Sequence, residues 1–237
     1  MLLEDKVAVV YGARGAIGGA VARAFAEEGA QVFGADVDAL DERAVDEHLQ
    51  QVVDEAGHVD ISFNAIGLPD DDIVGEPLES TDAQRFARPI AAYTTSYFLT
   101  ARHAARHMRA RGGGVILTVS ALPARVGTQL NGGYGTAVAA KEALTRDLSV
   151  ELAPHGIRVV CLRPHGLPES DTMREVFAAK DMGLTWEQFI GYLTATSHPK
   201  RTQTLAEVGS AAAWLASDRA SGLTGTTVNL TMGATPD

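Results

Sequence analysis

A glycine-rich turn near the start of the chain has the residue types and spacing to hold a phosphate. The segment Gly12-Ala13-Arg14-Gly15-Ala16-Ile17-Gly18 follows a short apolar run and precedes an alanine- and valine-rich stretch. Glycine lets backbone N–H groups approach a pyrophosphate, and the N-terminus of a following helix favours its negative charge. We therefore predict a dinucleotide site here, while the methyl of Ala16 keeps a purely structural turn open as the alternative. The predicted contacts are Gly12, Ala13, Arg14, Gly15, Ile17 and Gly18.

Such a site needs a sheet to position it, and strand and helix signals alternate along the chain. We expect strands over 7–11, 31–35, 59–63, 115–119, 157–162 and 226–230. We expect helices over 20–28, 42–56, 81–111 (broken or entered at Pro89), 135–153, 186–195 and 204–217. Continuous apolar strands between helices are typical of a parallel sheet covered on both faces. The prediction is an α/β fold: one Rossmann-like domain over 1–237 with a doubly wound parallel sheet.

Composition excludes several classes of partner. The 237 residues carry a formal net charge of −10, which argues against nucleic acid and anionic membranes. The one cysteine, Cys161, cannot form an internal disulfide, and no signal peptide or membrane-length apolar run is evident, so we expect a cytoplasmic protein. No spacing of metal ligands is present, so no metal is predicted. His103 and His107, one helical turn apart, are expected on the surface.

Five segments together resemble the short-chain dehydrogenase/reductase family. They are 12–18, the strand end 59–67, the stretch 119–138 around Tyr134, 144–159 and 215–225, which together span nearly the whole chain. The resemblance implies NAD or NADP as cofactor, with no preference established, and a small alcohol or ketone as substrate. It also implies that Asn64, Ala65, Ile66 and Gly67 line the adenosine side of the cofactor and that Pro164 backs the nicotinamide. Alternatively, Asn64 only ties neighbouring strands together.

The resemblance makes Tyr134 the family's catalytic tyrosine, the general acid or base of the reaction. The family's serine, lysine and asparagine positions read Ala121, Val138 and Tyr93. An unassisted phenol has a pKa of about 10, and acid–base assistance is typically worth ~10²–10⁴ in rate. His165, inserted in the turn that backs the nicotinamide, is a second catalytic candidate, with a bland hydrogen-bonding role as its alternative. Lys141 lies about 10.5 Å farther along the helix and cannot simply replace the missing lysine.

In the family that this chain resembles, a further strand and crossover helix stand between the glycine turn and Asn64, so the spacing here is about two dozen residues shorter than the resemblance implies. We therefore predict that the sheet lacks one strand near residues 32–40, or that the chain is broken there. Asp36 lies on the order of 20 residues past the turn, where a ribose-binding acid belongs. Asp38 instead fits the family's next strand end, where an aspartate contacts adenine. We slightly favour the second alternative.

Three functions stay open. The leading hypothesis is a divergent NAD(P)-binding oxidoreductase, and the others are a catalytically silent relative and a lyase or dehalogenase that uses Tyr134 as its acid or base. The intact turn argues mildly against the halohydrin dehalogenases, which resemble this fold but replace that turn. Residues 166–202 should fold over the pocket, either around an apolar ligand or on a core of their own. Apolar residues in excess on helices 81–111 and 135–153 predict a homodimer or homotetramer.

Overall fold

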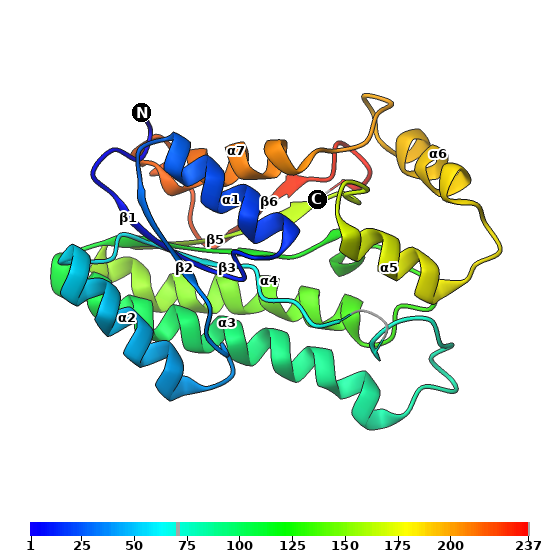
Figure 1. Ribbon diagram of the computed structural model, residues 1–237, viewed down its shortest axis with the longest axis horizontal. Helices are drawn as coiled ribbons and strands as arrows, with labels where there is room; N and C mark the ends of the chain where they lie inside the picture. The colour runs from blue at the N-terminus through cyan, green and yellow to red at the C-terminus, as the bar shows by residue number, and fades with distance from the viewer. Residues whose placement is uncertain (70–71, 237) are drawn as a thin grey trace.

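Across the part of the chain that the structure describes, six parallel strands form one sheet in the order β2-β1-β3-β4-β5-β6 (Figure 1). The computed structural model describes residues 1–69 and 72–236. The strands are β1 (Val7–Tyr11), β2 (Gln31–Ala35), β3 (Ile61–Asn64), β4 (Gly114–Val119), β5 (Ile157–Pro164) and β6 (Thr226–Leu230). The predicted α/β fold with a parallel, Rossmann-like sheet is confirmed.

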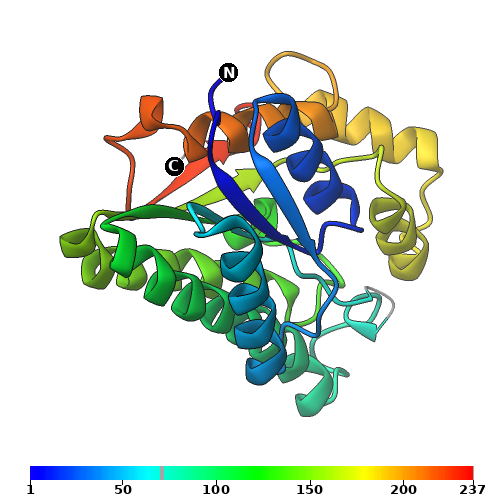
Figure 2. The same ribbon diagram turned by 60° about the vertical axis from the view of Figure 1, so that its left-hand side comes forward.

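Helices cover both faces of this sheet (Figures 1 and 2). One face carries α1 (Ala16–Glu27) and α7 (Leu205–Ala216), and the other carries α2 (Glu42–Ala56), α3 (Ala83–Arg111) and α4 (Tyr134–Leu152). Two further helices, α5 (Asp171–Lys180) and α6 (Trp186–Thr196), lie beside the carboxyl ends of the strands. Pro89 lies inside α3, so this helix is neither broken nor entered there, contrary to our expectation.

Two hydrophobic cores flank the sheet because successive strand residues face opposite sides. Along β1, Val7, Val9 and Tyr11 pack toward α2 and α3, whereas Ala8 and Val10 pack toward α1 and α7. All five side chains are buried. The continuous apolar run is thus what a strand covered on both faces requires.

Helix ends follow local capping chemistry. The side chain of Asp41 accepts hydrogen bonds from the first turn of α2, and Asp82 does the same for α3. Gly57 and Gly112 end these two helices in the left-handed conformation, at φ of 83° and 86°. The bounds of α2 are those expected from the sequence.

The sheet lacks one strand near residues 32–40, as the short spacing between the glycine turn and Asn64 predicted. Strand β2 pairs with β1 from Val7↔Gln31 to Tyr11↔Ala35 and stands at the edge of the sheet. The chain then runs through residues 36–41 directly into α2 and returns as β3 on the other side of β1. Residues 32–40 are described without interruption, so the missing strand is confirmed and the alternative of a broken chain is wrong.

His103 is not on the surface, contrary to our expectation. Its side chain is 2% exposed, and Nδ1 lies 2.7 Å from Oδ1 of Asp46 on α2. The carboxylate comes from another helix, which is why it was invisible in the local sequence. Among residues 1–69 and 72–236, no helix has the length and apolarity needed to cross a membrane, and no group of acidic, histidine and cysteine side chains could hold a metal ion.

Candidate active site

The glycine turn and residues 64–67 meet at the carboxyl edge of the sheet. Strands β1 and β3 lie side by side, with Tyr11 opposite Asn64, but the chain leaves them toward opposite sides of the sheet. Such a reversal opens a crevice at the carboxyl ends of the two strands, which is where parallel α/β sheets bind ligands. The glycine turn follows β1 here, and residues 64–67 end β3.

Two glycines of the turn are required by the backbone around them. Gly12 has φ of 79°, and a Cβ there would lie 2.7 Å from the Ala65 carbonyl oxygen. A Cβ on Gly18 would overlap the Gly12 carbonyl oxygen. Helix α1 begins at Ala16 with no side-chain cap and no acidic residue in its first turn. A close-packed glycine cradle beside an uncapped helix N-terminus fits the pyrophosphate of a dinucleotide.

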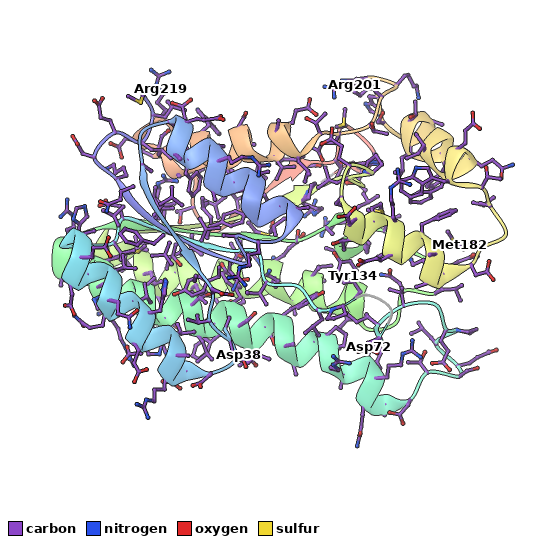
Figure 3. The ribbon with its side chains drawn as sticks, in the orientation of Figure 1. Asp38, Asp72, Tyr134, Met182, Arg201 and Arg219 are labelled. Carbon is purple, nitrogen blue, oxygen red and sulfur yellow. The ribbon has the colours of Figure 1, made fainter. Side chains whose placement is uncertain are left out.

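The structure places Asp36 beside the turn and Asp38 in the loop that follows. Asp36 comes directly after β2, and its carboxylate forms an exposed ion pair with Arg14. Asp38 accepts a hydrogen bond from Leu40 N at 2.9 Å (Figure 3 shows it at the loop leading into α2). Because β2 pairs directly with β1, Asp36 occupies the end of the strand next to the glycine turn.

Asn64 is fixed by three parts of the structure. Its Nδ2 donates to Thr100 Oγ1 on α3 at 3.2 Å, and its Oδ1 accepts from Lys141 Nζ on α4 at 3.3 Å. Its backbone oxygen accepts from Thr118 Oγ1 at 3.0 Å. The tying role that we left open for Asn64 is therefore present. The amide also fixes where residues 65–67 begin, beside the glycine turn.

Tyr134 lies in an apolar cluster at the start of α4 (Figure 3). This cluster brings together Ala121, Val138 and Tyr93, the three positions that we aligned with the family's helpers. The Tyr93 ring meets the Tyr134 ring edge-on, with centroids 6.0 Å apart and planes at 84°. A Cβ at Gly133 would overlap the Phe86 carbonyl oxygen, so α3 and α4 touch where Tyr134 begins its helix. Ala121, Val138 and the Tyr93 ring therefore pack in the same apolar cluster as Tyr134.

Lys141 is buried directly behind this cluster. Its side chain is 2% exposed, and Nζ lies 6.0 Å from the Tyr93 ring centroid and 5.8 Å from that of Tyr97. Burial lowers the pKa of Lys141 to about 8, an effect that Cys161 partly opposes. The sequence predicted that Lys141 lies on the same helix as Tyr134. It did not predict that the rings of Tyr93 and Tyr97 on α3 face the Lys141 ammonium.

A buried ion pair that sequence reasoning missed supports the next two strand ends. Glu142 Oε1 accepts from Arg163 Nε at 2.7 Å and from Ser120 Oγ at 2.7 Å. Glu142 Oε2 accepts from Arg163 Nη2 at 2.9 Å. Ser120 precedes Ala121, and Arg163 precedes Pro164, so this pair fixes the backbone on both sides of the site. Local spacing carries no signal for it, since Glu142 and Arg163 are on different elements.

His165 is buried beside the end of α6 and Gln203. Its backbone N–H donates to Gln203 Oε1 at 2.9 Å, and its Nε2 lies 3.3 Å from Thr196 Oγ1 at the end of α6. Burial lowers the pKa of His165, an effect that a backbone hydrogen bond at Gly166 partly opposes. Pro164 is the last residue of β5 and pairs with Leu230. A catalytic role for His165 stays a prediction.

The segment over the site packs on a core of its own. Phe177 of α5 lies 5.3 Å, centroid to centroid, from both Trp186 and Phe189 of α6. Lys180, at the end of α5, donates to Gln129 O at 2.9 Å and to Asn131 Oδ1 at 3.0 Å. This lysine anchors α5 on the loop that precedes Tyr134.

A cleft of about 840 Å³ lies beside the first turn of α4. It is lined mainly by residues between 123 and 132, together with Pro77, Leu78 and Met182. Gly135 and Thr136 line it, but Tyr134 does not, so the cleft flanks the tyrosine and we do not assign it to substrate.

Comparisons with known proteins agree with this geometry. A family model described as enoyl-(acyl carrier protein) reductase matches residues 34–235. Cis-4-hydroxycyclohexanecarboxylate dehydrogenase of Sinomonas cyclohexanicum is 32% identical over 244 residues, covering 93% of each chain. (+)-Borneol dehydrogenase 1 of Salvia officinalis is 31% identical, covering 97% of this chain and 93% of its own. Secoisolariciresinol dehydrogenase of Forsythia intermedia is 30% identical, covering 94% and 86%. The structure of an NAD⁺-bound xylitol dehydrogenase shares the fold, with a TM-score of 0.88 at 23% identity, covering 97% of this chain and 99% of its own.

Proposed function

Because this chain belongs to the short-chain dehydrogenase/reductase family, we propose that it interconverts a small alcohol and its ketone, with Tyr134 exchanging the proton. The predicted cofactor class, NAD or NADP, is confirmed by that membership. One observation carries the proposal: the Tyr134 ring meets the Tyr93 ring, whose hydroxyl accepts a hydrogen bond from Leu68 N just past the end of β3. In an enzyme that binds a nicotinamide dinucleotide at the carboxyl edge of its sheet, a phenol at this edge can exchange a proton with the substrate.

The cofactor would lie along the carboxyl edge of the sheet. Its pyrophosphate would be held by the glycine cradle of residues 12–18 and its adenosine by Asp36 or Asp38 together with residues 64–67. Pro164 would back the nicotinamide. When bound, this group accepts or supplies the hydride. The Arg14–Asp36 ion pair places a cation beside an anion. The carboxylate of Asp36 would favour the ribose hydroxyls of NAD, whereas the guanidinium of Arg14 would favour the 2′-phosphate of NADP.

Tyr134 carries the proton. In reduction, the Tyr134 hydroxyl gives its proton to the carbonyl oxygen as the carbonyl carbon receives the hydride, and solvent then returns a proton to the phenolate. In oxidation, the phenolate takes the alcohol proton. The apolar cluster of Ala121, Val138 and Tyr93 excludes water from one side of the ring.

The machinery around Tyr134 is atypical in this proposal. Ala121 offers no hydroxyl to the substrate oxygen, and Val138 offers no ammonium to the phenol. Since acid–base assistance is typically worth ~10²–10⁴ in rate, we expect slow turnover on generic ketones. The named substrates of two relatives, borneol and cis-4-hydroxycyclohexanecarboxylate, are ring alcohols, which makes a ring alcohol the first class to test.

A second candidate is a silent relative that binds the dinucleotide without turnover. The residue types at Ala121 and Val138 favour it, because neither supplies the hydroxyl or the ammonium that the family carries at these positions. Turnover measurements separate this candidate from an active enzyme.

The experiment combines calorimetry and absorbance. NAD⁺, NADH, NADP⁺ and NADPH are titrated into the protein, and turnover is followed at the nicotinamide absorbance band with borneol, cyclohexanol, camphor and cyclohexanone. Turnover that disappears in Tyr134→Phe, with cofactor binding retained, supports the proposal. Binding without turnover supports the silent relative. A Tyr134→Phe protein as fast as the parent would make the tyrosine structural, and binding of none of the four cofactors would count against both candidates.

We also propose a homodimer or homotetramer that pairs α3 and α4 with their copies. Phe98 on α3 is 40% exposed and Val150 on α4 is 78% exposed, although both are apolar. Light scattering should give at least twice the mass of one chain, and Val150→Lys should lower it. A monomer at micromolar concentration would refute this arrangement.

A further inference from the structure

Lys141 carries a charge in a place where lysine is rarely found without an acidic partner. Its side chain is 2% exposed, and its hydrogen-bond acceptor is the neutral amide oxygen of Asn64, at 3.3 Å. Buried lysines are rare unless paired, because burying a charge costs free energy. The adjacent carboxylate of Glu142 is bound by Arg163 through hydrogen bonds of 2.7 and 2.9 Å. A side chain kept at such a cost is a candidate for function.

The Tyr93 ring lies between the ammonium of Lys141 and the Tyr134 ring as their shared neighbour. Helical side chains lean toward the N-terminus of their helix, so Lys141 reaches back toward the end of α4 that carries Tyr134. Its Nζ lies 6.0 Å from the Tyr93 ring centroid, and the Tyr93 and Tyr134 rings are 6.0 Å apart. These two separations place the ammonium no farther than about 12 Å from the Tyr134 ring.

Lys141 and Tyr93 also hold the two ends of the segment predicted to line the cofactor. Lys141 binds Asn64 at the start of this segment. The hydroxyl of Tyr93 accepts a hydrogen bond from Leu68 N at 3.2 Å at its other end. The charge is therefore connected on one side to the cofactor segment and on the other, through the Tyr93 ring, to Tyr134.

We propose that Lys141 is a positioning residue for the Tyr134 reaction, whose buried ammonium acts through Asn64 and Tyr93 to stabilise the negative charge that develops on the Tyr134 oxygen. This inference rests on the proposed alcohol–ketone chemistry. For a separation on the order of 12 Å and an effective dielectric constant of ~20, one unit charge changes the rate of such a step by on the order of tenfold. This rate effect is smaller than that of a lysine in direct contact with the phenol, because Coulomb energy falls with distance.

The titration of Lys141 provides a way to switch this charge off. Burial lowers the pKa of Lys141 to about 8. The titratable groups facing it are Tyr93 and Tyr97 of α3 and Cys161 of β5; burial raises the pKa of Tyr97 above its usual range and that of Cys161 to about 11. Glu142, on its own helix, is paired with Arg163. Raising the pH through about 8 to 9 therefore removes the ammonium while Tyr97 and Cys161 stay protonated.

The test compares the parent with Lys141→Met, which removes the charge at similar volume, and Lys141→Gln, which keeps a donor for Asn64 without a charge. Reduction of camphor and cyclohexanone by NADH and NADPH is measured from about pH 6.5 to about pH 9.5, and cofactor affinity is measured by calorimetry. We expect both variants to lose about tenfold in kcat near pH 7 with little change in cofactor Kd, and the parent to lose this advantage above about pH 9. Lys200→Met, at an exposed position, is the control.

Two results would overturn the inference while leaving the proposed function intact. One is a parent-to-variant ratio that stays constant with pH, and the other is full rescue by Lys141→Gln. Either would mean that Lys141 only holds Asn64 in place. A parent that binds cofactor but reduces no ketone and oxidises no alcohol would refute the proposed function itself, and this inference with it.

Discussion

Removing Glu142 should destabilise the fold more than removing both members of its ion pair. Glu142 and Arg163 side chains are 7% and 4% exposed, so Glu142→Leu leaves a guanidinium buried without its carboxylate and leaves Ser120 Oγ only the longer hydrogen bond to Leu162 O, at 3.4 Å. Breaking a buried pair in this way typically costs about 3–5 kcal/mol, which is a large share of a total stability of about 5–15 kcal/mol. The double variant Glu142→Leu/Arg163→Met removes both charges together and should cost clearly less than the single variant.

Urea denaturation of the parent, each single variant and the double variant gives the required free energies of unfolding. Glu47→Leu, which breaks an exposed i,i+4 pair with Arg43, is the control and should leave stability nearly unchanged. Cofactor affinity should fall with Glu142→Leu, because the pair fixes the backbone next to Ala121 and Pro164. A loss below about 1 kcal/mol for the single variant, or a double variant no more stable than the single, would refute this reasoning.

Three further predictions concern charge and chemistry at the site. Burial lowers the pKa of Lys141 from 10.5 to about 8, so the unfolded chain binds more protons than the folded chain between these pH values. The stability of the parent relative to Lys141→Met should therefore rise by about 3 kcal/mol as the pH rises from about 7 to about 10.5. A stability difference that is equal at both ends of a pH series of denaturation curves would contradict this. Asp36→Ala removes a carboxylate and frees Arg14 for a 2′-phosphate, so the ratio of NADP⁺ to NAD⁺ affinity should rise about 10- to 100-fold by calorimetry, and an unchanged ratio would place the selecting residues elsewhere. Ala121→Ser combined with Val138→Lys should raise cyclohexanone reduction by at least about tenfold, and a protein that still binds NADH but gains no activity would count against the assignment of these positions.

Much of the architecture is local information, and the sequence determined it. Continuous apolar runs located the strands, and the expected range 42–56 matches the bounds of α2 in the structure. The glycine turn was readable because only glycine tolerates the backbone approach at Gly12 and Gly18. Even the missing strand was predictable, since too few residues separate the turn from Asn64 to build another strand and helix.

Only the tertiary structure decided which charges and rings surround the candidate tyrosine. Lys141 was dismissed on helical spacing, yet it binds Asn64, 77 positions away, and faces two tyrosines of another helix. The partners of Glu142 and His103 likewise come from elements distant in the sequence. Periodicity reports which face of an element is buried, but not which residues meet it there. The pKa of a buried group depends on those neighbours, so the chemistry around Tyr134 could be read only once α3, α4 and β3 were packed together.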